Sequence, residues 1–365
     1  MHRIAAQYLF TGKAMIPRGV VTLDDTGLVL AIEQLADTET CSTEFYNGIL
    51  TPGFVNAHCH LELSHYRDLL PMWRGEGLDK FIHIMKDWYL CTRLDENMYM
   101  LMQQADDEMY DEGIVAVGDI CNTNYSFSLK TKSRLYYHSF VEMLGLDEKR
   151  VQGIIEGIGE VYDDALSLGL SASITPHALY SMNPALLDYA VDAANKSRIL
   201  SLHYKEGENE RNSSLVPFLN RLSRNTRLLL IHNTFVSNTD IEAVNDATEK
   251  AVWVLCPNSN DYISRSLPPA ELLYRKGQRV AFGTDSLASN TLLSILDEMI
   301  TLSQHFPQIP LEALLEWATL GGATALNKTD KFGLLIPGRR PGLVLIEGID
   351  FTNMKLLTTV KARRI

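Results

Sequence analysis

Cysteine is scarce in this 365-residue sequence, and its five residues follow no regular spacing. Their odd number and scatter argue against a disulfide-stapled scaffold and against a cysteine-based zinc motif. Reduced thiols are typical of a cytosolic protein, so we expect a cytoplasmic location. The five residues are Cys41, Cys59, Cys91, Cys121 and Cys256.

An excess of positive charge and long apolar runs are also lacking. Thirty-three Lys and Arg residues stand against 45 Asp and Glu residues, which gives a formal net charge of −12. Without a basic cluster to attract phosphates, we expect no nucleic-acid partner and no anionic membrane partner. No stretch approaches the ~20 apolar residues of a transmembrane helix, and the N-terminal stretch lacks the apolar core of a secretory signal. The expected partner is a small-molecule substrate, and a homodimer is a possible assembly.

Internal repeats and low-complexity tracts are absent, but the chain has a clear rhythm. Runs rich in Val, Ile, Leu and Ala end in a polar residue and alternate with stretches of helical character. Alternating strands and helices imply a parallel sheet, and eight such units match a (β/α)8 barrel of ~250 residues. We therefore predict an α/β fold with a TIM-like barrel over residues 52–333. The eight runs are "GFVNAHCH", "IVAVGDI", "RLYYHSFVE", "SASITPH", "ILSLHY", "RLLLIHN", "AVWVLC" and "RVAFGTD".

The two ends of the chain have a different character. Residues 1–51 alternate apolar and polar side chains, as in "VVTLDDTGLVLAIEQ", around a turn-forming Asp-Asp-Thr-Gly sequence. Residues 334–365 contain similar short strand patterns, as in "GLVLIEGID". We expect the two ends to form one small composite β-sandwich beside the barrel.

Metal-binding side chains occur where these strands end. His58 and His60 close the first run, and they share one face because side chains two apart on a strand point the same way. Active sites of such barrels lie at the carboxyl ends of the strands. A catalytic zinc-like ion takes about three or four N or O ligands and leaves a position for water. His203 and Asp285 are the best candidates to complete the set.

Three further polar residues lie near the predicted ligands. Glu206 follows His203 by three residues, and a carboxylate there could accept a proton from water, whose pKa a divalent ion lowers to ~7. Alternatively, Glu206 is an ordinary solvent-exposed residue of a loop. His232 could stabilise a developing negative charge or serve as a structural histidine. His177, in "TPHALYS", fits a substrate contact better than a further metal ligand.

Several motifs together carry a family resemblance that covers nearly the whole chain. They are "PGFVNAHCHLELS", "HALYS", "HYKE", "CPNSN", "GTDSLASN" and "DKFGLLIPGRRPGLVLI". The sequence resembles the amidohydrolase superfamily, and within it the ATZ/TRZ-like aminohydrolases, which include S-adenosylhomocysteine, guanine and aminodeoxyfutalosine deaminases. The resemblance implies a (β/α)8 barrel, a composite β-sandwich and one divalent metal ion. On matching positions it implies these roles: metal ligands His58, His60, His203 and Asp285, proton shuttle Glu206, orienting residue His232, and substrate-facing residues His177 and Ser289.

The sequence also departs from the family pattern. Binuclear members have a carboxylated lysine at the end of the fourth strand, where this chain has His177, so we expect a single ion. Zinc and iron(II) both suit imidazole and carboxylate ligands, and the choice between them stays open. Asn258 and Asp261, around the "CPNSN" motif, differ from many relatives and could alter which substrate fits.

The expected activity is metal-dependent hydrolytic deamination of an amino-substituted heterocycle of the nucleoside or nucleobase class. Glu206 would pass a proton to a ring nitrogen while His232 and Asp285 steady the tetrahedral intermediate. The opening "FVNAHCHLELS" is most similar to members that deaminate 6-amino-6-deoxyfutalosine. Alternatives are an adenosine, S-adenosylhomocysteine or guanine deaminase, a chlorohydrolase-like enzyme, an amide-cleaving hydrolase, and a non-catalytic scaffold.

The segment of residues 61–113 leaves the carboxyl end of the first strand and should pass over the mouth of the barrel. It contains an amphipathic helix pattern in "GLDKFIHIMKDWYL", most of which is expected to pack against the barrel. Trp73, Phe81 or His83 could line the pocket, because a flat heterocycle stacks well on a ring. Glu142, at the end of the third strand, could hold a pair of ribose hydroxyls or pair with a nearby cation.

Overall fold

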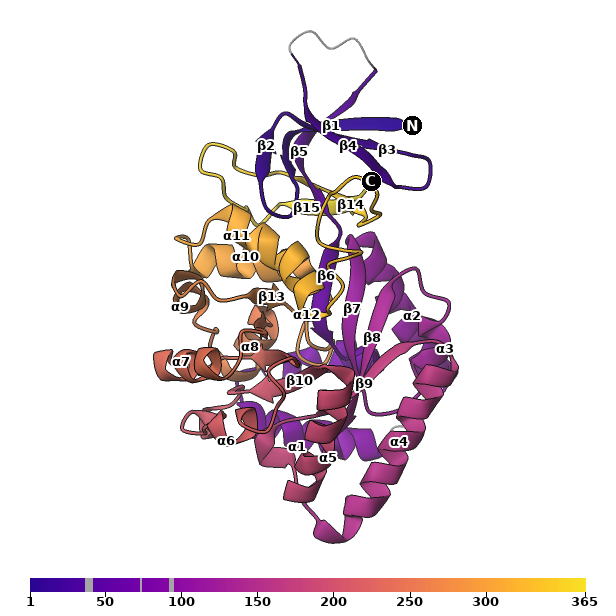
Figure 1. Cartoon of the computed structure of the whole chain (residues 1–365), viewed down its shortest axis with the longest axis vertical. Helices are drawn as coiled ribbons and strands as arrows, with labels where there is room; N and C mark the ends of the chain where they lie inside the picture. Colours follow the sequence, from indigo (N-terminus) through magenta and orange to yellow (C-terminus); the bar gives the residue numbers. More distant parts are fainter. Residues whose placement is uncertain (37–41, 73, 92–94) are drawn as a thin grey trace.

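A computed structural model describes residues 1–36, 42–72, 74–91 and 95–365 of the chain. Along its longest axis, a mainly antiparallel β region lies at one end and a larger α/β region at the other (Figure 1). Among the described residues, no helix combines the length and the apolar character that crossing a bilayer would require.

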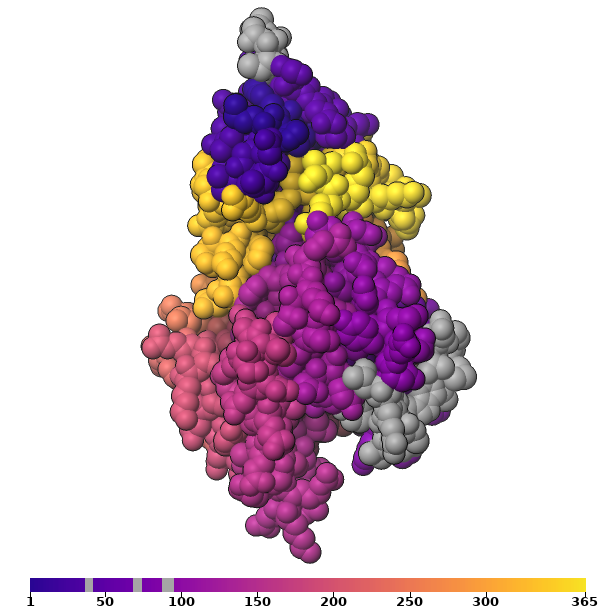
Figure 2. Space-filling model, turned by 90° about the vertical axis from the view of Figure 1, so that its right-hand side faces the viewer, coloured from indigo at the N-terminus to yellow at the C-terminus, as the bar shows by residue number. Residues whose placement is uncertain are grey.

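The β region is a seven-stranded sheet that contains strands from both ends of the chain. Its order is β15-β14-β5-β1-β3-β4, and β2 pairs with β1. C-terminal β14 pairs antiparallel with β5, and in Figure 2 the yellow C-terminal segment accordingly lies between the indigo N-terminal strands and the magenta α/β region. The strands are β1 (His2–Phe10), β2 (Met15–Pro17), β3 (Gly19–Leu23), β4 (Val29–Gln34), β5 (Glu44–Pro52), β14 (Leu343–Glu347) and β15 (Lys361–Arg364).

The predicted Asp-Asp-Thr-Gly turn joins β3 to β4. The Asp24 carboxylate accepts hydrogen bonds from the backbone N–H groups of Thr26 and Leu28, and Gly27 has a φ of +79°. A left-handed residue of this kind suits glycine, which has no Cβ to clash. The alternating pattern in this segment therefore did predict an antiparallel hairpin.

Eight parallel strands form the centre of the α/β region, in two four-stranded sheets. Each strand coincides with one of the eight apolar runs, and only β7 and β8 extend one residue beyond theirs. Nearly all their side chains are buried, as expected for parallel strands covered on both faces. The strands are β6 (Phe54–Cys59), β7 (Ile114–Cys121), β8 (Tyr136–Met143) and β9 (Ser171–Pro176) in one sheet, and β10 (Ile199–Tyr204), β11 (Arg227–His232), β12 (Ala251–Leu255) and β13 (Val280–Phe282) in the other.

Backbone contacts link the outer strands of the two sheets. The N–H groups of Thr284 and Asp285, just after β13, both donate to the carbonyl of His58 in β6, at 2.9 and 3.1 Å. The N–H of His203 in β10 donates to the carbonyl of His177 after β9 at 2.9 Å. The mixed α/β fold is thus confirmed, whereas the closed barrel and the domain boundaries stay predictions.

One glycine permits the close approach of β13 to β6. A Cβ on Gly283 would lie 2.7 Å from the Cβ of His58 and 2.9 Å from its carbonyl oxygen. Any larger side chain at position 283 would push the two strands apart. The glycine of "GTD" therefore brings Asp285 next to His58.

Helices fill the connections and mostly cover the outer side of the parallel strands (Figure 1). Helix α5 begins as the sequence predicts, with Asn183 as its N-cap, whose side chain accepts a bond from the N–H of Ala185, and with Pro184 in the first turn. The main helices are α1 (Leu78–Cys91), α2 (Glu96–Asp111), α4 (Val151–Ser167), α5 (Pro184–Ser197), α7 (Asn238–Ala247), α8 (Pro257–Ser264) and α10 (Ile295–His305). Shorter ones are η1 (Leu61–Met72), α3 (Phe127–Lys130), η2 (Glu148–Arg150), η3 (Leu179–Ser181), η4 (Glu208–Glu210), α6 (Val216–Leu219), α9 (Ala270–Arg275), α11 (Leu311–Glu316), η5 (Trp317–Gly321) and α12 (Gly322–Ala325).

Candidate active site

Imidazole rings from three strands meet at the carboxyl ends of the parallel strands. The ring of His58 lies 5.0 Å from that of His60 and 4.9 Å from that of His203, centroid to centroid. Ligand atoms of these three residues all lie within 4.8 Å of one another, and so do those of His58, His232 and Asp285. The structure thus brings together all four predicted metal ligands and the predicted orienting histidine.

Asp285 presents its two carboxylate oxygens to different partners. Oδ1 lies 3.5 Å from Nε2 of His60 and 3.7 Å from Nε2 of His58. Oδ2 accepts hydrogen bonds from Ser259 Oγ at 2.6 Å and Ser289 Oγ at 2.8 Å. The two hydroxyl groups fix the carboxylate so that its other oxygen faces the imidazoles.

Hydrogen bonds also fix the tautomers of two rings. Nδ1 of His203 donates to the carbonyl of His177 at 3.0 Å, and Nδ1 of His232 donates to Asn260 Oδ1 at 2.9 Å. In each ring the lone pair is therefore on Nε2, the atom that faces the cluster. The buried Nε2 of His58 has no hydrogen-bond partner in the part of the chain that the structure describes. A buried polar atom without a partner is costly, and a cation would satisfy it.

The protonation states suit a divalent cation. Burial lowers the pKa of His60, lowers that of His203 well below its usual value, and lowers that of His232 to about 4. These rings are neutral at pH 7, which is the form that binds metals. Burial raises the pKa of Asp285, but the adjacent imidazoles outweigh this effect and hold it well below its usual value. Three imidazoles and one carboxylate match the ligand chemistry of zinc and iron(II).

Glu206 lies beside this cluster and is also buried. Its Oε1 is 3.5 Å from Nε2 of His232. Burial, together with the nearby carboxylates of Asp285, Glu210 and Glu142, raises the pKa of Glu206 well above its usual value. A carboxyl group with a raised pKa can both accept and return a proton near neutral pH.

Left-handed backbone conformations gather at these strand ends. The φ angles are +49° at Lys205, +70° at His232, +59° at Asn233 and +58° at Asp285. Such angles are unfavourable for residues with a Cβ and cost on the order of 1 kcal/mol or more each. Strain of this kind concentrates at functional sites, where surrounding contacts hold it in place.

A cavity of about 440 Å³ opens from the cluster to the surface. Its deep end is polar and its walls are apolar. Of the predicted substrate contacts, His177, Glu142 and Phe81 line it. The full lining is His60, Leu63, Leu78, Phe81, Ile82, Met85, Lys86, Asn122, Glu142, Leu144, Ile154, Ile158, His177, His203, Glu206, His232, Asp285 and Ser286.

Other predicted substrate residues do not reach the cavity. Ser289 lies behind Asp285, to which it donates a hydrogen bond. The side chain of Asn258 accepts a hydrogen bond from Thr301 of α10 at 2.5 Å, and neither Asn258 nor the exposed His83 is among the lining residues. Trp73 lies outside the described residues. Substrate binding by these residues stays a prediction.

Asp119, at the end of β7, lies apart from the cluster. Its Oδ2 lies 2.6 Å from Nζ of Lys130, and both side chains are fully buried. Its Oδ1 accepts a hydrogen bond from the N–H of Leu61 at 2.7 Å. Because Leu61 follows His60, this buried pair holds the chain in place at a predicted ligand.

Three residues that orient side chains of the site were not predicted from the sequence. Asn260 orients His232, Ser259 orients Asp285, and Asn122 Nδ2 donates to Oε2 of Glu142 at 3.0 Å. The "CPNSN" motif contains the first two, so the motif itself was the available signal. No local pattern pointed to Asn122.

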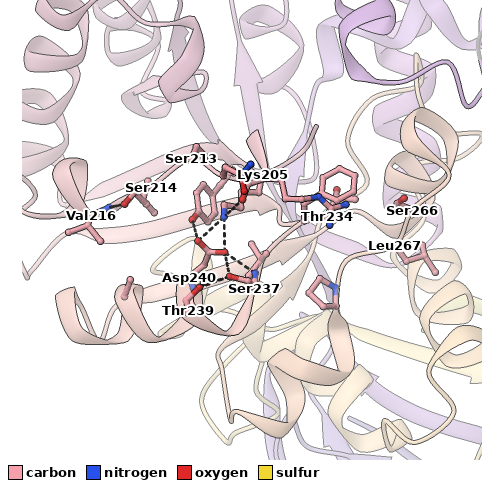
Figure 3. Close-up of a pocket in the computed structure, with 18 residues that line it drawn as sticks. Lys205, Ser213, Ser214, Val216, Thr234, Ser237, Thr239, Asp240, Ser266 and Leu267 are labelled. Carbon is pink, nitrogen blue, oxygen red and sulfur yellow. Dashed lines mark hydrogen bonds and ion pairs between the residues drawn. The ribbon is translucent and has the colours of Figure 1, made fainter. Parts of the chain in front are cut away.

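A second cavity, of about 850 Å³, lies beside the turn that carries Glu206 (Figure 3). Lys205 lines it, and its Nζ contacts both carboxylate oxygens of Asp240 at 2.7 Å. The same Nζ donates to the carbonyl of Arg211 at 2.8 Å. The consecutive residues Lys205 and Glu206 thus line different cavities. The hydrogen bonds of the Lys205 ammonium group all lie on the side of the larger cavity, away from the histidine cluster.

Comparison with known proteins supports the resemblance inferred from the motifs. The model of the Amidohydrolase family matches residues 49–363. A 5-methylthioadenosine/S-adenosylhomocysteine deaminase from Desulforudis audaxviator is 27% identical over 372 residues, which cover 92% of this chain and 81% of that protein. The crystal structure of Helicobacter pylori aminofutalosine deaminase with methylthio-coformycin has a TM-score of 0.79 at 22% identity and covers 97% of this chain and 94% of that chain.

A zinc-containing structure has a similar fold. The adenosine deaminase from Xanthomonas campestris with bound zinc has a TM-score of 0.71 at 23% identity, over 94% of this chain and 84% of that chain. Since the family model spans most of the chain, the expectation of a hydrolase that acts on carbon–nitrogen bonds is confirmed. This chain belongs to the amidohydrolase family.

Proposed function

We propose that this protein is a metal-dependent deaminase of adenosine-like substrates. The observation that carries the proposal is the buried Glu206 carboxyl beside His232, at the deep end of a cavity that is also lined by three of the four proposed metal ligands, His60, His203 and Asp285. The relative named as a 5-methylthioadenosine/S-adenosylhomocysteine deaminase supports the substrate class.

His58, His60, His203 and Asp285 would hold one divalent ion, zinc or iron(II). The unpartnered Nε2 of His58 and the neutral state of the imidazoles support this assignment. When bound, such an ion lowers the pKa of water to ~7 and so supplies a nucleophile at neutral pH. No other residue type in the cluster is needed to complete a four-ligand set.

The remaining chemistry belongs to side chains of the chain. Glu206 accepts a proton from the attacking water and transfers it to a ring nitrogen of the heterocycle. His232 has its Nδ1 proton engaged by Asn260, so its Nε2 faces the reacting atoms and can exchange hydrogen bonds there. Burial of Glu206 and His232 excludes bulk water from the reacting centre. After hydroxide has added to the ring carbon, Glu206 takes the remaining hydroxyl proton and delivers it to the amino group, so that the carbon–nitrogen bond breaks, a carbonyl forms and ammonia leaves.

Two residues are placed to bind the rest of a nucleoside. Glu142 lines the cavity, and its buried Oε1 has no hydrogen-bond partner among the described residues, which suits an acceptor for a ribose hydroxyl. His177 also lines the cavity, and its Nδ1 is 2.9 Å from Oγ of Ser181. Its other nitrogen is therefore the one available to a substrate.

Among adenosine-like compounds, we infer 6-amino-6-deoxyfutalosine as the specific substrate. Support comes from the "FVNAHCHLELS" motif and from the similar fold of Helicobacter pylori aminofutalosine deaminase. 5-Methylthioadenosine and S-adenosylhomocysteine are alternatives that the name of the Desulforudis relative suggests, and adenosine is an alternative that the name of the Xanthomonas campestris structure suggests.

We also infer that the eight parallel strands act as one closed barrel. The bonds from residues 284 and 285 to His58, and from His203 to His177, support closure at the two junctions between the sheets. The pairing of β14 with β5 supports a composite terminal domain made of residues 1–51 and 334–365.

An ammonia-release assay tests the proposed function. The full-length protein, loaded separately with Zn²⁺ or Fe²⁺, is incubated with 6-amino-6-deoxyfutalosine, adenosine, 5-methylthioadenosine, S-adenosylhomocysteine and guanine. We expect release from the adenosine-like compounds, fastest from the first, and loss of activity after chelation. A metal-loaded protein that releases no ammonia from any adenosine-like compound would refute the proposal. A protein that retains well under one equivalent of metal would favour the scaffold alternative.

A further inference from the structure

A third cavity, of about 400 Å³, lies where the terminal β sheet meets the α/β region (Figure 1). One side of it comes from the β3–β4 hairpin and from the chain next to β14 and β15. The other side comes from the end of α2 and the starts of β7 and β8. Junctions between structural units are common places for small-molecule sites.

This cavity is separate from the active-site cavity. Tyr136, the first residue of β8, lines it, whereas Glu142 of the same strand lines the active-site cavity. The two residues are six positions apart, which is roughly 20 Å along a strand at ~3.3 Å per residue. A ligand bound here would therefore not compete with a substrate.

Three arginines line the cavity, and no described acidic residue does. They are Arg134, Arg340 and Arg364, and they form a local reversal of sign in a chain whose net charge is −12. The three lie far apart in the sequence, so no basic cluster is visible there. Arg134 and Arg364 both stack on the ring of Tyr110, with their Cζ atoms 3.6 and 3.7 Å from its centroid. The fold thus gathers the positive charges.

Only one of the three guanidinium groups is paired with a carboxylate of the described chain. Arg134 lies 2.7 Å from Oδ1 of Asp107. Arg340 donates from Nε to the hydroxyl of Thr26 at 3.0 Å, and Arg364 donates to two backbone carbonyl groups. Two of the three positive charges therefore lack an anionic contact.

The electrostatic surroundings leave this positive charge incompletely compensated. Asp24 and Asp111 lie near two of the arginines, but neither makes an ion pair with them and neither lines the cavity. Burial lowers the pKa of Arg364, and the nearby charge of Arg134 lowers it as well. The neighbouring acidic groups oppose this effect without outweighing it. A bound anion would relieve the imbalance.

Most of the remaining lining is apolar or aromatic. Leu135 and Leu343 are buried, and the rings of Tyr136 and Phe332 lie 5.8 Å apart. The hydroxyl oxygen of Tyr136 is buried and has no hydrogen-bond partner in the described part of the chain. An isolated buried hydroxyl is costly, and a ligand oxygen beside it would satisfy it. The walls thus suit a flat apolar body that carries a polar group.

We propose that this cavity binds a phosphate monoester with an apolar or aromatic body, at a site separate from the active site. The two guanidinium groups without a carboxylate partner match the charge of such an ester, which is about −1.5 to −2 near pH 7. Guanidinium groups also fit phosphate oxygens geometrically, because they offer parallel N–H donors. The bound ester would join the terminal sheet to the α/β region. The proposal does not rest on the deaminase function.

Isothermal titration calorimetry of the metal-loaded full-length protein tests the site with three probes. Phenyl phosphate has a ring and about two negative charges, phenyl sulfate has nearly the same shape and one charge, and inorganic phosphate lacks the ring. We expect saturable binding of phenyl phosphate with a Kd below ~1 mM. The other two probes should bind about tenfold more weakly, because each lacks either one charge or the apolar contact.

Substitutions at one exposed arginine locate the binding. Arg340→Met removes a positive charge at an exposed position and should leave the fold intact. We expect it to raise the Kd of phenyl phosphate about tenfold, as loss of a charge-assisted contact does, and Arg340→Glu to abolish binding. Lys331→Met is the matched control, because it also removes one positive charge next to Phe332 but at a residue that does not line the cavity. Its Kd should stay as in the unaltered protein.

Thermal unfolding provides a second measurement. Because a ligand of the folded state stabilises it, phenyl phosphate should raise the Tm of the unaltered protein and of Lys331→Met more than that of Arg340→Met. Absence of saturable binding, or equal affinity for phenyl phosphate and inorganic phosphate, would overturn the proposal. A Kd that is the same with and without Arg340 would place the probe elsewhere, for example at the metal, and would overturn it too. An equal loss of affinity in Lys331→Met would reduce the effect to overall charge and contradict the site.

Discussion

Two cavities flank the turn at residues 205 and 206, and they differ in how their polar groups are satisfied. In the larger one, Lys205 and Asp240 form a complete pair, with further bonds to the carbonyl of Arg211 and from Tyr204 Oη. Thr234 also lines the larger cavity, and its Oγ1 has no hydrogen-bond partner among the described residues. In the smaller cavity the atom without such a partner is a carboxylate oxygen, Oε1 of Glu142. Nε2 of His58, whose ring lies 5.0 Å from that of the lining residue His60, has no described hydrogen-bond partner either. Buried groups are almost always paired, so the unpaired ones indicate a place for a ligand. The unpartnered carboxylate oxygen and imidazole nitrogen favour the smaller cavity as the proposed active site, whereas the charged groups of the larger cavity, Lys205 and Asp240, are paired with each other.

The sharpest test of this contrast is the removal of the acid–base group from the smaller cavity. Glu206→Gln keeps the size of the side chain but cannot accept a proton. We expect kcat to fall by about 10³-fold or more, since general acid–base catalysis is typically worth 10²–10⁴-fold. Metal content, measured by mass spectrometry, should not change, because Glu206 is not a proposed ligand. Turnover near that of the unaltered protein would exclude the shuttle role.

The corresponding change in the larger cavity should affect stability instead. Lys205→Met leaves the partly buried Asp240 carboxylate without its cation, and loss of such a charged partner costs about 1–3 kcal/mol of the free energy of unfolding. Urea denaturation measures the loss. Below the unfolding transition, kcat should fall less than tenfold. If the variant lost activity as Glu206→Gln does but kept its stability, the distinction between the two cavities would be wrong.

A smaller effect is expected from the hydrogen bond that orients His232. Asn260→Ala removes the acceptor of the His232 Nδ1 proton, so the ring can adopt the wrong tautomer. Loss of such an orienting partner typically costs 10–100-fold in activity or metal affinity. We expect kcat to fall within this range while KM stays nearly the same. Asn245→Ala, at an exposed position of α7 that does not line this cavity, is the control and should be close to neutral.

The smallest expected effect is a dependence of stability on pH in the larger cavity. Burial raises the pKa of Asp240, but hydrogen bonds from Lys205 and Ser237 outweigh it and lower the pKa below its usual value. A depressed folded-state pKa contributes stability that is present above the unfolded value of about 3.9 and is lost as pH falls through the folded value. In Lys205→Met the acid-unfolding midpoint, followed by circular dichroism, should move to higher pH. An unchanged midpoint would show that the pair contributes little to acid stability.

Much of the fold could be predicted because its determinants are local. The eight parallel strands match eight apolar runs, since strands buried on both faces need continuous apolar sequence. The turn around Asp24 and the cap at Asn183 follow from the hydrogen-bonding habits of those side chains. The pairing of β14 with β5 was harder to predict. The sequence of a strand indicates that it is a strand, but it does not indicate which distant strand it pairs with.

The candidate site was predictable to a similar extent and for the same reason. His58, His60, His203 and Asp285 stand where strands end, and topology alone brings such positions together. Asp119 ends a strand as well, but it pairs with Lys130, which no local pattern indicates. The exact partners of Asn258 and Asn260, one facing α10 and the other His232, depend on side-chain directions that the motif does not specify.

The contact that Gly283 permits also constrains the order of events during synthesis. It joins the first parallel strand to the last, and the nearby side-chain bond from Asn56 to Thr284 spans 228 residues of chain. A nascent polypeptide thus carries His58 and His60 long before Asp285 leaves the ribosome. Because closing so long a loop is slow and entropically costly, we expect the proposed ligand set to be complete only at a late stage of folding. Acquisition of metal by the growing chain would accordingly mark the moment when both ends of the strand array have met.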